Sequence, residues 1–255
     1  MKLTYFDKIS CEPLVLTGIG SICSPRLRDI SRLGLDTYNL YLSCLLMSPR
    51  NYYDMKNLSS FYESMTEEEQ AEQNLFDLVT ADPELCPLYE RVLNFFFLEE
   101  IRYHAEYNVF LSFRAAQKGE EEPEAAGIIR RENFDEIADL ILQLNYIAGK
   151  AEQPAKVKNK KASEILKKLQ KGRALKPQSK EDAEKMDLGN IISSLASYHK
   201  SLNLINIWDL TVYQLYDQFY RQNNNNVYDI QAMSVSAWGD KENHFAVDGW
   251  FQPLR

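Results

Sequence analysis

The chain has 255 residues, of which 45% are hydrophobic, and a net charge of -8 at pH 7. This size and apolar content suffice for one large or two small folded domains, which excludes disorder throughout. The acidic balance, with a pI near 5.1, excludes a surface that wraps nucleic acid as a whole, because phosphate binding needs clustered Lys and Arg.

The four cysteines, Cys11, Cys23, Cys44 and Cys86, all lie in the first third of the chain. They form no C-x-x-C pair and have no histidines at ligand spacing, so we expect reduced thiols and neither a zinc site nor a redox motif. The first ten residues lack an apolar signal core, and no window approaches about 18 uninterrupted apolar residues. We therefore expect a protein that is neither secreted nor membrane-spanning.

The N-terminal region predicts extended structure followed by helix. Residues 3–9 alternate imperfectly and 14–22 form an apolar run, which favours two short strands or an extended arm. Gly18 and Gly20 lack the lysine or third glycine of a nucleotide-binding loop, so that function is not indicated. Residues 26–47 carry apolar side chains at helical intervals and predict one helix or two short ones.

Two helix starts are then visible. Residues 66–69 (TEEE) are a capping box, in which the hydroxyl and the third glutamate exchange hydrogen bonds with each other's backbone, and this predicts a helix over 67–80. Asp82 and Pro83 are typical of an N-cap and a first-turn proline, and they predict a helix over 84–97.

Aromatic and β-branched residues predict a hairpin over 99–113. The acidic run 119–124 is interpreted as a solvated loop, because consecutive like charges repel and hydrate, and not as a metal site. Asn133 or Asp135 begins an amphipathic helix that Gly149 ends. The region 1–149 is thus predicted to be a mixed α+β module with a small β-hairpin, within a fold that is mainly α.

The segment 150–186 is basic, in contrast to the acidic remainder of the chain. Twelve Lys and Arg against five acidic residues give 150–185 a charge of +7, which leaves -15 for the rest of the chain. We interpret it as a basic flexible connector with one short helix over 162–170. An exposed linker, docking on a partner protein and nucleic-acid binding through 156–185 remain open, although no aromatic residues for base stacking accompany these charges.

A helical C-terminal module with an aromatic tail is predicted over 187–255. It contains three predicted helices joined by two turns, and the second turn falls at the asparagine run 223–226. These helices would form a bundle or a helical hairpin. They are predicted at Leu188–His199, Leu204–Arg221 and Val227–Trp238.

The same module holds more aromatic side chains than a small core needs. Some should pack in the core, where burial of Trp208, Phe219 or Trp238 contributes roughly 2 to 3 kcal/mol each. Others should line a groove or an oligomer interface. The candidate protein-interaction residues are Trp208, Tyr213, Tyr216, Phe219, Tyr220, Trp238 and Trp250.

Three stretches carry a resemblance to a known family. They are KASEILKKLQKGR (161–173), INIWDLTVYQLYDQFYR (205–221) and SVSAWGDKENHF (234–245), the last followed by Trp250 and Phe251. Over about residues 160–251 the chain resembles proteins of tailed phages and prophages of Gram-positive bacteria that are similar to tail assembly chaperones.

That resemblance implies a non-enzymatic tail morphogenesis factor that binds the tape-measure protein or another tail protein during assembly. It implies a location in the cytoplasm of the infected or lysogenic host, with a homo-oligomer as a further option and no membrane partner. The alternative is a structural component of the virion, such as a tail, neck or baseplate protein.

No motif indicates an enzyme. His104, His199 and His244 are far apart in the sequence, and no G-x-S-x-G, H-E-x-x-H or P-loop pattern is present. Asp209 and Asp217 lie eight residues apart on one predicted helix and are interpreted as solvated. We expect no catalytic residue, no cofactor and no metal.

Overall fold

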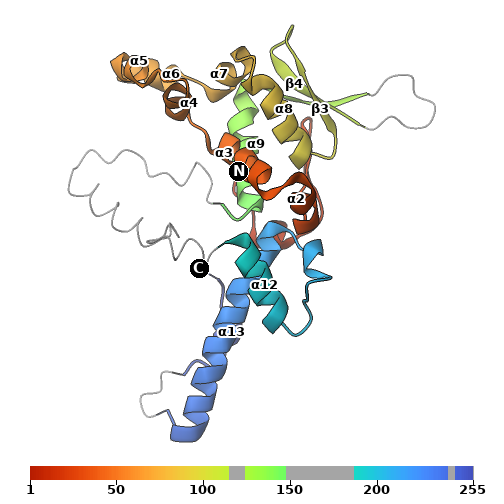
Figure 1. Cartoon of the computed structure of the whole chain (residues 1–255), viewed down its shortest axis with the longest axis vertical. Helices are drawn as coiled ribbons and strands as arrows, with labels where there is room; N and C mark the ends of the chain where they lie inside the picture. Colours follow the sequence, from red (N-terminus) through yellow and green to blue (C-terminus); the bar gives the residue numbers. More distant parts are fainter. Residues whose placement is uncertain (115–123, 148–186, 241–244, 255) are drawn as a thin grey trace. The chain divides into compact units, whose positions relative to one another are not determined.

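The computed structural model describes residues 1–114, 124–147, 187–240 and 245–254 of the chain (Figure 1). The chain divides into two compact units, Met1–Glu152 and Gln153–Arg255, which are described separately. Helices dominate and the strands form two small antiparallel sheets, which confirms the predicted fold class. The predicted limits 1–149, 150–186 and 187–255 stay a prediction. The connector and its helix at 162–170 lie outside the described residues.

The first unit begins with a short helix and a hairpin, α1 (Tyr5–Ile9), β1 (Leu14–Leu16) and β2 (Gly20–Ile22). The hairpin agrees with the strands predicted within 14–22, whereas the extended conformation predicted for 3–9 is wrong. Thr4 Oγ1 accepts a hydrogen bond from the Asp7 N–H at 3.2 Å, and the Asp7 carboxylate accepts one from the Thr4 N–H at 2.9 Å. This capping box starts a helix that the irregular alternation conceals.

A run of short helices follows. They are α2 (Leu27–Leu33), α3 (Leu35–Leu46), α4 (Pro49–Met55), α5 (Ser59–Ser64), α6 (Glu67–Glu72) and α7 (Leu75–Ala81). Gly34, with φ +94°, separates α2 from α3, so the region 26–47 takes the two-helix form of the prediction. The capping box at 66–69 is confirmed, because Thr66 Oγ1 accepts from the Glu69 N–H at 3.2 Å.

The single helix predicted over 67–80 is wrong, because the chain breaks between α6 and α7. Asn74 Oδ1 accepts a hydrogen bond from the Phe76 N–H at 2.8 Å. Asparagine favours such N-caps over helix interiors, since its side chain competes for the backbone. The break lets α7 start afresh and bury Phe76 in the core.

The second half of the unit comprises α8 (Leu85–Phe96), β3 (Glu100–His104), β4 (Val109–Phe113), β5 (Ala125–Ile129) and α9 (Arg131–Leu144). The predicted hairpin over 99–113 is confirmed. The third strand, β5, was not predicted, and it pairs antiparallel with β4 so that Phe110 lies opposite Ile129. The predicted helix after Asn133 is present but starts two residues earlier, at Arg131.

Aromatic rings join these layers into one core. Phe76 of α7 lies 5.4 Å from the ring of Phe134 on α9 and 6.0 Å from that of Phe110 on β4. Tyr89 of α8 packs on Phe134 at 5.7 Å. The β1–β2 hairpin joins the same core through Ile22, which is fully buried. Figure 1 shows α9 passing between the other helices of this unit, so its apolar face is covered from several sides.

A buried carboxylate with a half-buried lysine partner fixes the start of α8. Asp82 accepts hydrogen bonds from the Glu84 and Leu85 N–H groups at 2.9 and 3.1 Å, and its other oxygen lies 2.7 Å from Lys56 Nζ. Burial by itself raises the pKa of this carboxyl. The contact with Lys56 and the two N–H donors outweigh burial and hold its pKa below the ordinary value of 3.8.

Replacing Asp82 by Asn should destabilise the first unit by about 1–2 kcal/mol at pH 7. Because the folded-state pKa is depressed, the carboxylate stabilises the fold at pH values above 3.8. That contribution disappears as the pH falls through the folded pKa. Urea unfolding should show a smaller difference between wild type and Asp82→Asn at pH 3 than at pH 7.

Glu63→Gln is the matched control, because Glu63 forms an exposed pair with Arg50 at 3.4 Å and such pairs contribute little. An equal loss for Asp82→Asn at both pH values would contradict an electrostatic role for Asp82.

The second unit contains α12 (Leu188–Tyr198), η2 (Ile207–Asp209), α13 (Val212–Trp238) and η3 (Gly249–Phe251). Asp187 caps α12, accepting from the Gly189 and Asn190 N–H groups at 2.9 and 3.3 Å. The helix predicted from Leu204 starts only at Val212, where Thr211 Oγ1 accepts from the Gln214 N–H at 3.2 Å.

The break predicted at 223–226 is wrong, because α13 runs through all four asparagines as one helix of 27 residues. Each asparagine costs a helix only a few tenths of a kcal/mol, and Gln222 Nε2 donates to Asn226 Oδ1 one turn away at 3.0 Å. The described part of this unit is therefore a helical hairpin with a tail, one of the two predicted arrangements, and not a three-helix bundle.

Candidate protein-interaction surface

The core of the second unit lies between α12 and the first turns of α13. Ile191, Ile192 and Leu195 of α12 are buried, as are Val212 and Leu215 of α13. A helix rises 1.5 Å per residue, so α12 spans about 16 Å and α13 about 40 Å. α12 therefore accompanies only the beginning of α13, and α13 continues beyond it (Figure 1).

Beyond α12, apolar side chains of α13 are exposed to solvent. Ile230 and Met233 are each 64% exposed and Trp238 is 82% exposed. The spacing of three and four that predicted a third packed helix is present, yet no described residue covers this face. The expectation that Trp238 lies in the core is wrong, because Trp238 ends the helix beyond its covered part.

The C-terminal tail returns along another side of α13. The Tyr228 hydroxyl donates to the Val247 carbonyl at 3.1 Å, and the Tyr228 ring lies 5.4 Å from that of Phe245. Farther along, Arg221 Nη1 donates to the Gln252 carbonyl at 2.7 Å. These contacts hold 245–252 against the helix.

Held in this way, the tail presents apolar side chains outward. Trp250 and Phe251 are 55% and 56% exposed, and their rings meet edge to face at 5.0 Å. Val247 is exposed as well. We call Val247, Trp250 and Phe251 the tail patch.

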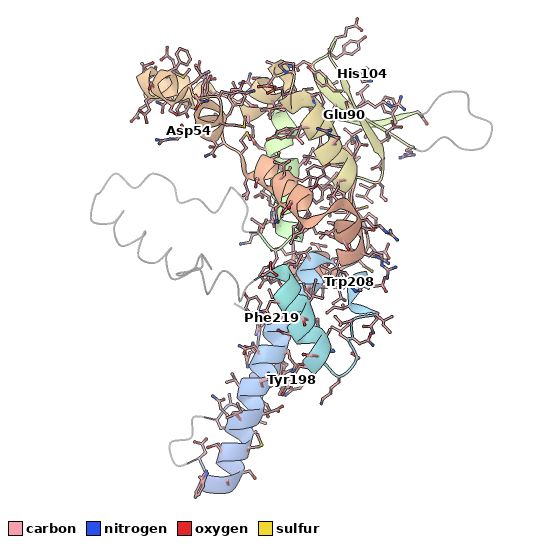
Figure 2. All side chains as sticks on the ribbon, viewed as in Figure 1. Asp54, Glu90, His104, Tyr198, Trp208 and Phe219 are labelled. Carbon is pink, nitrogen blue, oxygen red and sulfur yellow. The ribbon has the colours of Figure 1, made fainter. Side chains whose placement is uncertain are left out.

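The predicted interaction residues fall into two groups. Trp238 and Trp250 are exposed. The half-buried group is Trp208, Tyr213, Tyr216, Phe219 and Tyr220. Trp208 Nε1 donates to the Leu204 carbonyl at 2.9 Å, and Figure 2 places Trp208 and Phe219 on different elements of the unit. The structure thus does not gather the seven residues on one face.

The half-buried tyrosines are partly withdrawn from water. Burial, together with the nearby Tyr220 and Asp187, raises the pKa of Tyr216, and burial raises that of Tyr220. Both phenols stay neutral at physiological pH. Their position suits packing within the unit more than a free recognition surface.

The prediction that Asp217 is solvated is wrong. Asp217 is 5% exposed and accepts a hydrogen bond from Gln218 Nε2 at 3.2 Å, so it does not lie on a solvated face. Asp209 is exposed, as predicted. The two carboxylates therefore occupy different environments on successive elements.

The described histidines have local roles. His199 Nδ1 lies 3.2 and 3.1 Å from the backbone nitrogens of Ser201 and Leu202 and so organises the turn after α12. His104 packs against the Phe113 ring at 6.0 Å, and His244 lies outside the described residues. In the described part of the chain, no three His, Cys, Asp or Glu side chains are grouped to hold a metal ion.

Comparison with known proteins found a similarity for the C-terminal part of the chain. Residues 177–255, about the last third of the chain, match a phage-type family named after a Bacillus prophage protein. The family model is described as the YomV second domain. No curated protein and no solved structure matches this chain. The C-terminal part of the chain is thus similar to a phage-type family. The tail and chaperone roles stay predictions.

None of the described helices combines the length and apolar character needed to cross a membrane.

Proposed function

We propose that this protein is a non-enzymatic morphogenesis factor of a tailed phage, which binds the tape measure or another tail protein through its second unit. The carrying observation is the tail patch, in which Trp250 and Phe251 are kept exposed on a tail that Tyr228 and Arg221 hold against α13. The phage-type family match covers this same region.

Exposed aromatic rings on an ordered support are suited to protein recognition. Tryptophan and phenylalanine bring a large apolar area to an interface and lose little conformational entropy when a partner covers them. Because the tail is already held in place by Tyr228 and Arg221, its ordering adds little to the cost of binding. An amphipathic helix of a long helical client offers the complementary apolar side chains.

Co-expression with the tape-measure protein, followed by a pull-down, tests this proposal. Wild type should retain the client, and Trp250→Ala should lower retention about tenfold or more, since an interface tryptophan often contributes 2 kcal/mol or more. Trp250 is more than half exposed, so circular dichroism should report an unchanged fold.

Ile205→Ala is the matched control, because Ile205 is an exposed apolar residue outside the tail patch. Equal retention of wild type and Trp250→Ala would contradict the tail patch as the binding surface. The alternative function is a structural component of the virion. Mass spectrometry of purified particles distinguishes the two, because an assembly factor is absent from mature virions and a structural component is present.

A further inference from the structure

The uncovered part of α13 carries a heptad seam. Counting from Val212, apolar or amide side chains recur at alternating spacings of four and three, which is the a/d pattern of a two-stranded coiled coil. The a/d positions are Val212, Tyr216, Phe219, Asn223, Asn226, Ile230, Met233 and Ala237. The helix is continuous over all eight, so they share one face.

Only the second part of this seam is exposed. Val212 is buried and Tyr216 and Phe219 are half-buried, because they lie along the covered beginning of α13. From Asn223 onward the side chains face solvent, apart from a half-buried Asn226. We call the stretch from Asn223 to Ala237 the open seam.

The described tail residues, 245–254, are attached to α13 away from the open seam. Their anchors on α13 are Arg221 and Tyr228, which are seven residues apart and occupy the heptad position opposite the a/d face. The tail patch and the open seam therefore lie on different sides of one helix, and each is accessible while the other is occupied.

The charge and the polar groups of the open seam indicate which kind of partner it binds. Between Gln222 and Trp238 the one charged residue is Asp229, which flanks the seam, so the facing surfaces of two copies carry no charge repulsion at the a/d positions. Asn223 and Asn226 carry amides that both donate and accept. Asn226 Oδ1 already accepts from Gln222 Nε2 within the helix. The exposed Asn223 amide finds its complement in the same residue of another copy, whereas an apolar partner helix would leave it unsatisfied.

We infer that the open seam pairs with the same seam of a second copy of this chain, parallel and in register. Ile230 at an a position and an amide at Asn223 are features of parallel dimers, in which a buried asparagine fixes register and oligomeric state at some cost in stability. The pairing extends over about two heptads, so the dimer is expected to be reversible.

Sedimentation velocity across about 1 µM to 1 mM chain tests the inference. Wild type should convert from monomer to dimer within this range, and Ile230→Asp should remain monomeric. Ile230 is exposed within one chain, so this variant keeps its fold. Gln231→Asp adds the same charge at a b position, outside the seam, and should dimerise like wild type.

A second variant moves the equilibrium in the opposite direction. Asn223→Ile removes one of the two polar layers, Asn226 being the other, and should tighten the dimer about tenfold or more. A wild type that stays monomeric throughout, or an Ile230→Asp chain that dimerises as wild type does, would overturn the inference.

Register is tested by cross-linking in a Cys11→Ser background, because Cys11 is the exposed cysteine among the four. Asn223→Cys should form a disulfide-linked dimer on mild oxidation, since equivalent a positions face each other in a parallel pair, and Gln231→Cys should not. Failure of the Asn223→Cys link in a dimeric sample would overturn the parallel register. Client retention is unaffected by these outcomes, because the tail patch lies elsewhere.

Discussion

Phe76→Ala should lower the free energy of unfolding of the first unit by about 3–5 kcal/mol, because it leaves a cavity where three elements meet. Phe76 is 1% exposed and its ring contacts Phe110 on β4 and Phe134 on α9. These neighbours belong to a strand and a helix that are anchored elsewhere, so they relax only partly into the space. The aromatic pair contacts are lost together with the buried apolar area.

Urea and thermal unfolding of the full chain measure this loss. A change of this size corresponds to a drop of roughly 6–20 °C in the unfolding temperature of a unit of this length. Phe6→Ala is the matched control, because Phe6 is 76% exposed and its truncation removes little buried area. Equal unfolding temperatures for Phe76→Ala and Phe6→Ala would contradict the position of Phe76 in the core.

The sequence predicts the start of a helix correctly where a single capping side chain determines it. The capping box at 66–69 and the caps at Asp82 and Asp187 are short-range hydrogen bonds, and the sequence alone specifies them. The predictions for Asn74, placed inside a helix, and for the asparagine run at 223–226, placed in a turn, are both wrong. Asn74 caps a new helix through the Phe76 N–H, whereas the run at 223–226 continues a helix, in which Gln222 donates to Asn226 one turn away.

Long-range pairing was less visible. β5 contains two alanines and a glycine, which carry little strand propensity, and it becomes a strand because β4 offers an unpaired edge. The exposed face of α13 likewise depends on long-range packing that the local sequence does not specify. Periodicity showed that Ile230, Met233 and Ala237 share a helical face, but how far the covering helix α12 extends is a tertiary property.

Gly127→Ala should destabilise the first unit by about 2–4 kcal/mol although it adds only one methyl group. A Cβ at this position would lie 2.5 Å from Ile19 N and 2.6 Å from the carbonyl atoms of Gly18. All of these are backbone atoms, so no side-chain rotation relieves the overlap. The β1–β2 hairpin must instead move away from β5.

That movement breaks the hydrogen bonds that attach the hairpin to the sheet. The Ile128 N–H donates to the Gly18 carbonyl at 3.0 Å, and Ser112 Oγ donates to the Ile19 carbonyl at 2.6 Å. Ser112 is buried, so its hydroxyl would lose its partner inside the protein, which adds a desolvation cost to the steric one.

Amide hydrogen exchange reports this change at one site, because the Ile128 N–H should exchange much faster in Gly127→Ala than in wild type. Ala125→Val is the matched control: it enlarges an exposed residue of the same strand, and valine suits a strand. It should leave both exchange and the free energy of unfolding nearly unchanged. Unaltered protection of Ile128 in Gly127→Ala would mean that the Gly18 and Ile19 backbone does not lie close enough to Gly127 to clash with an added Cβ.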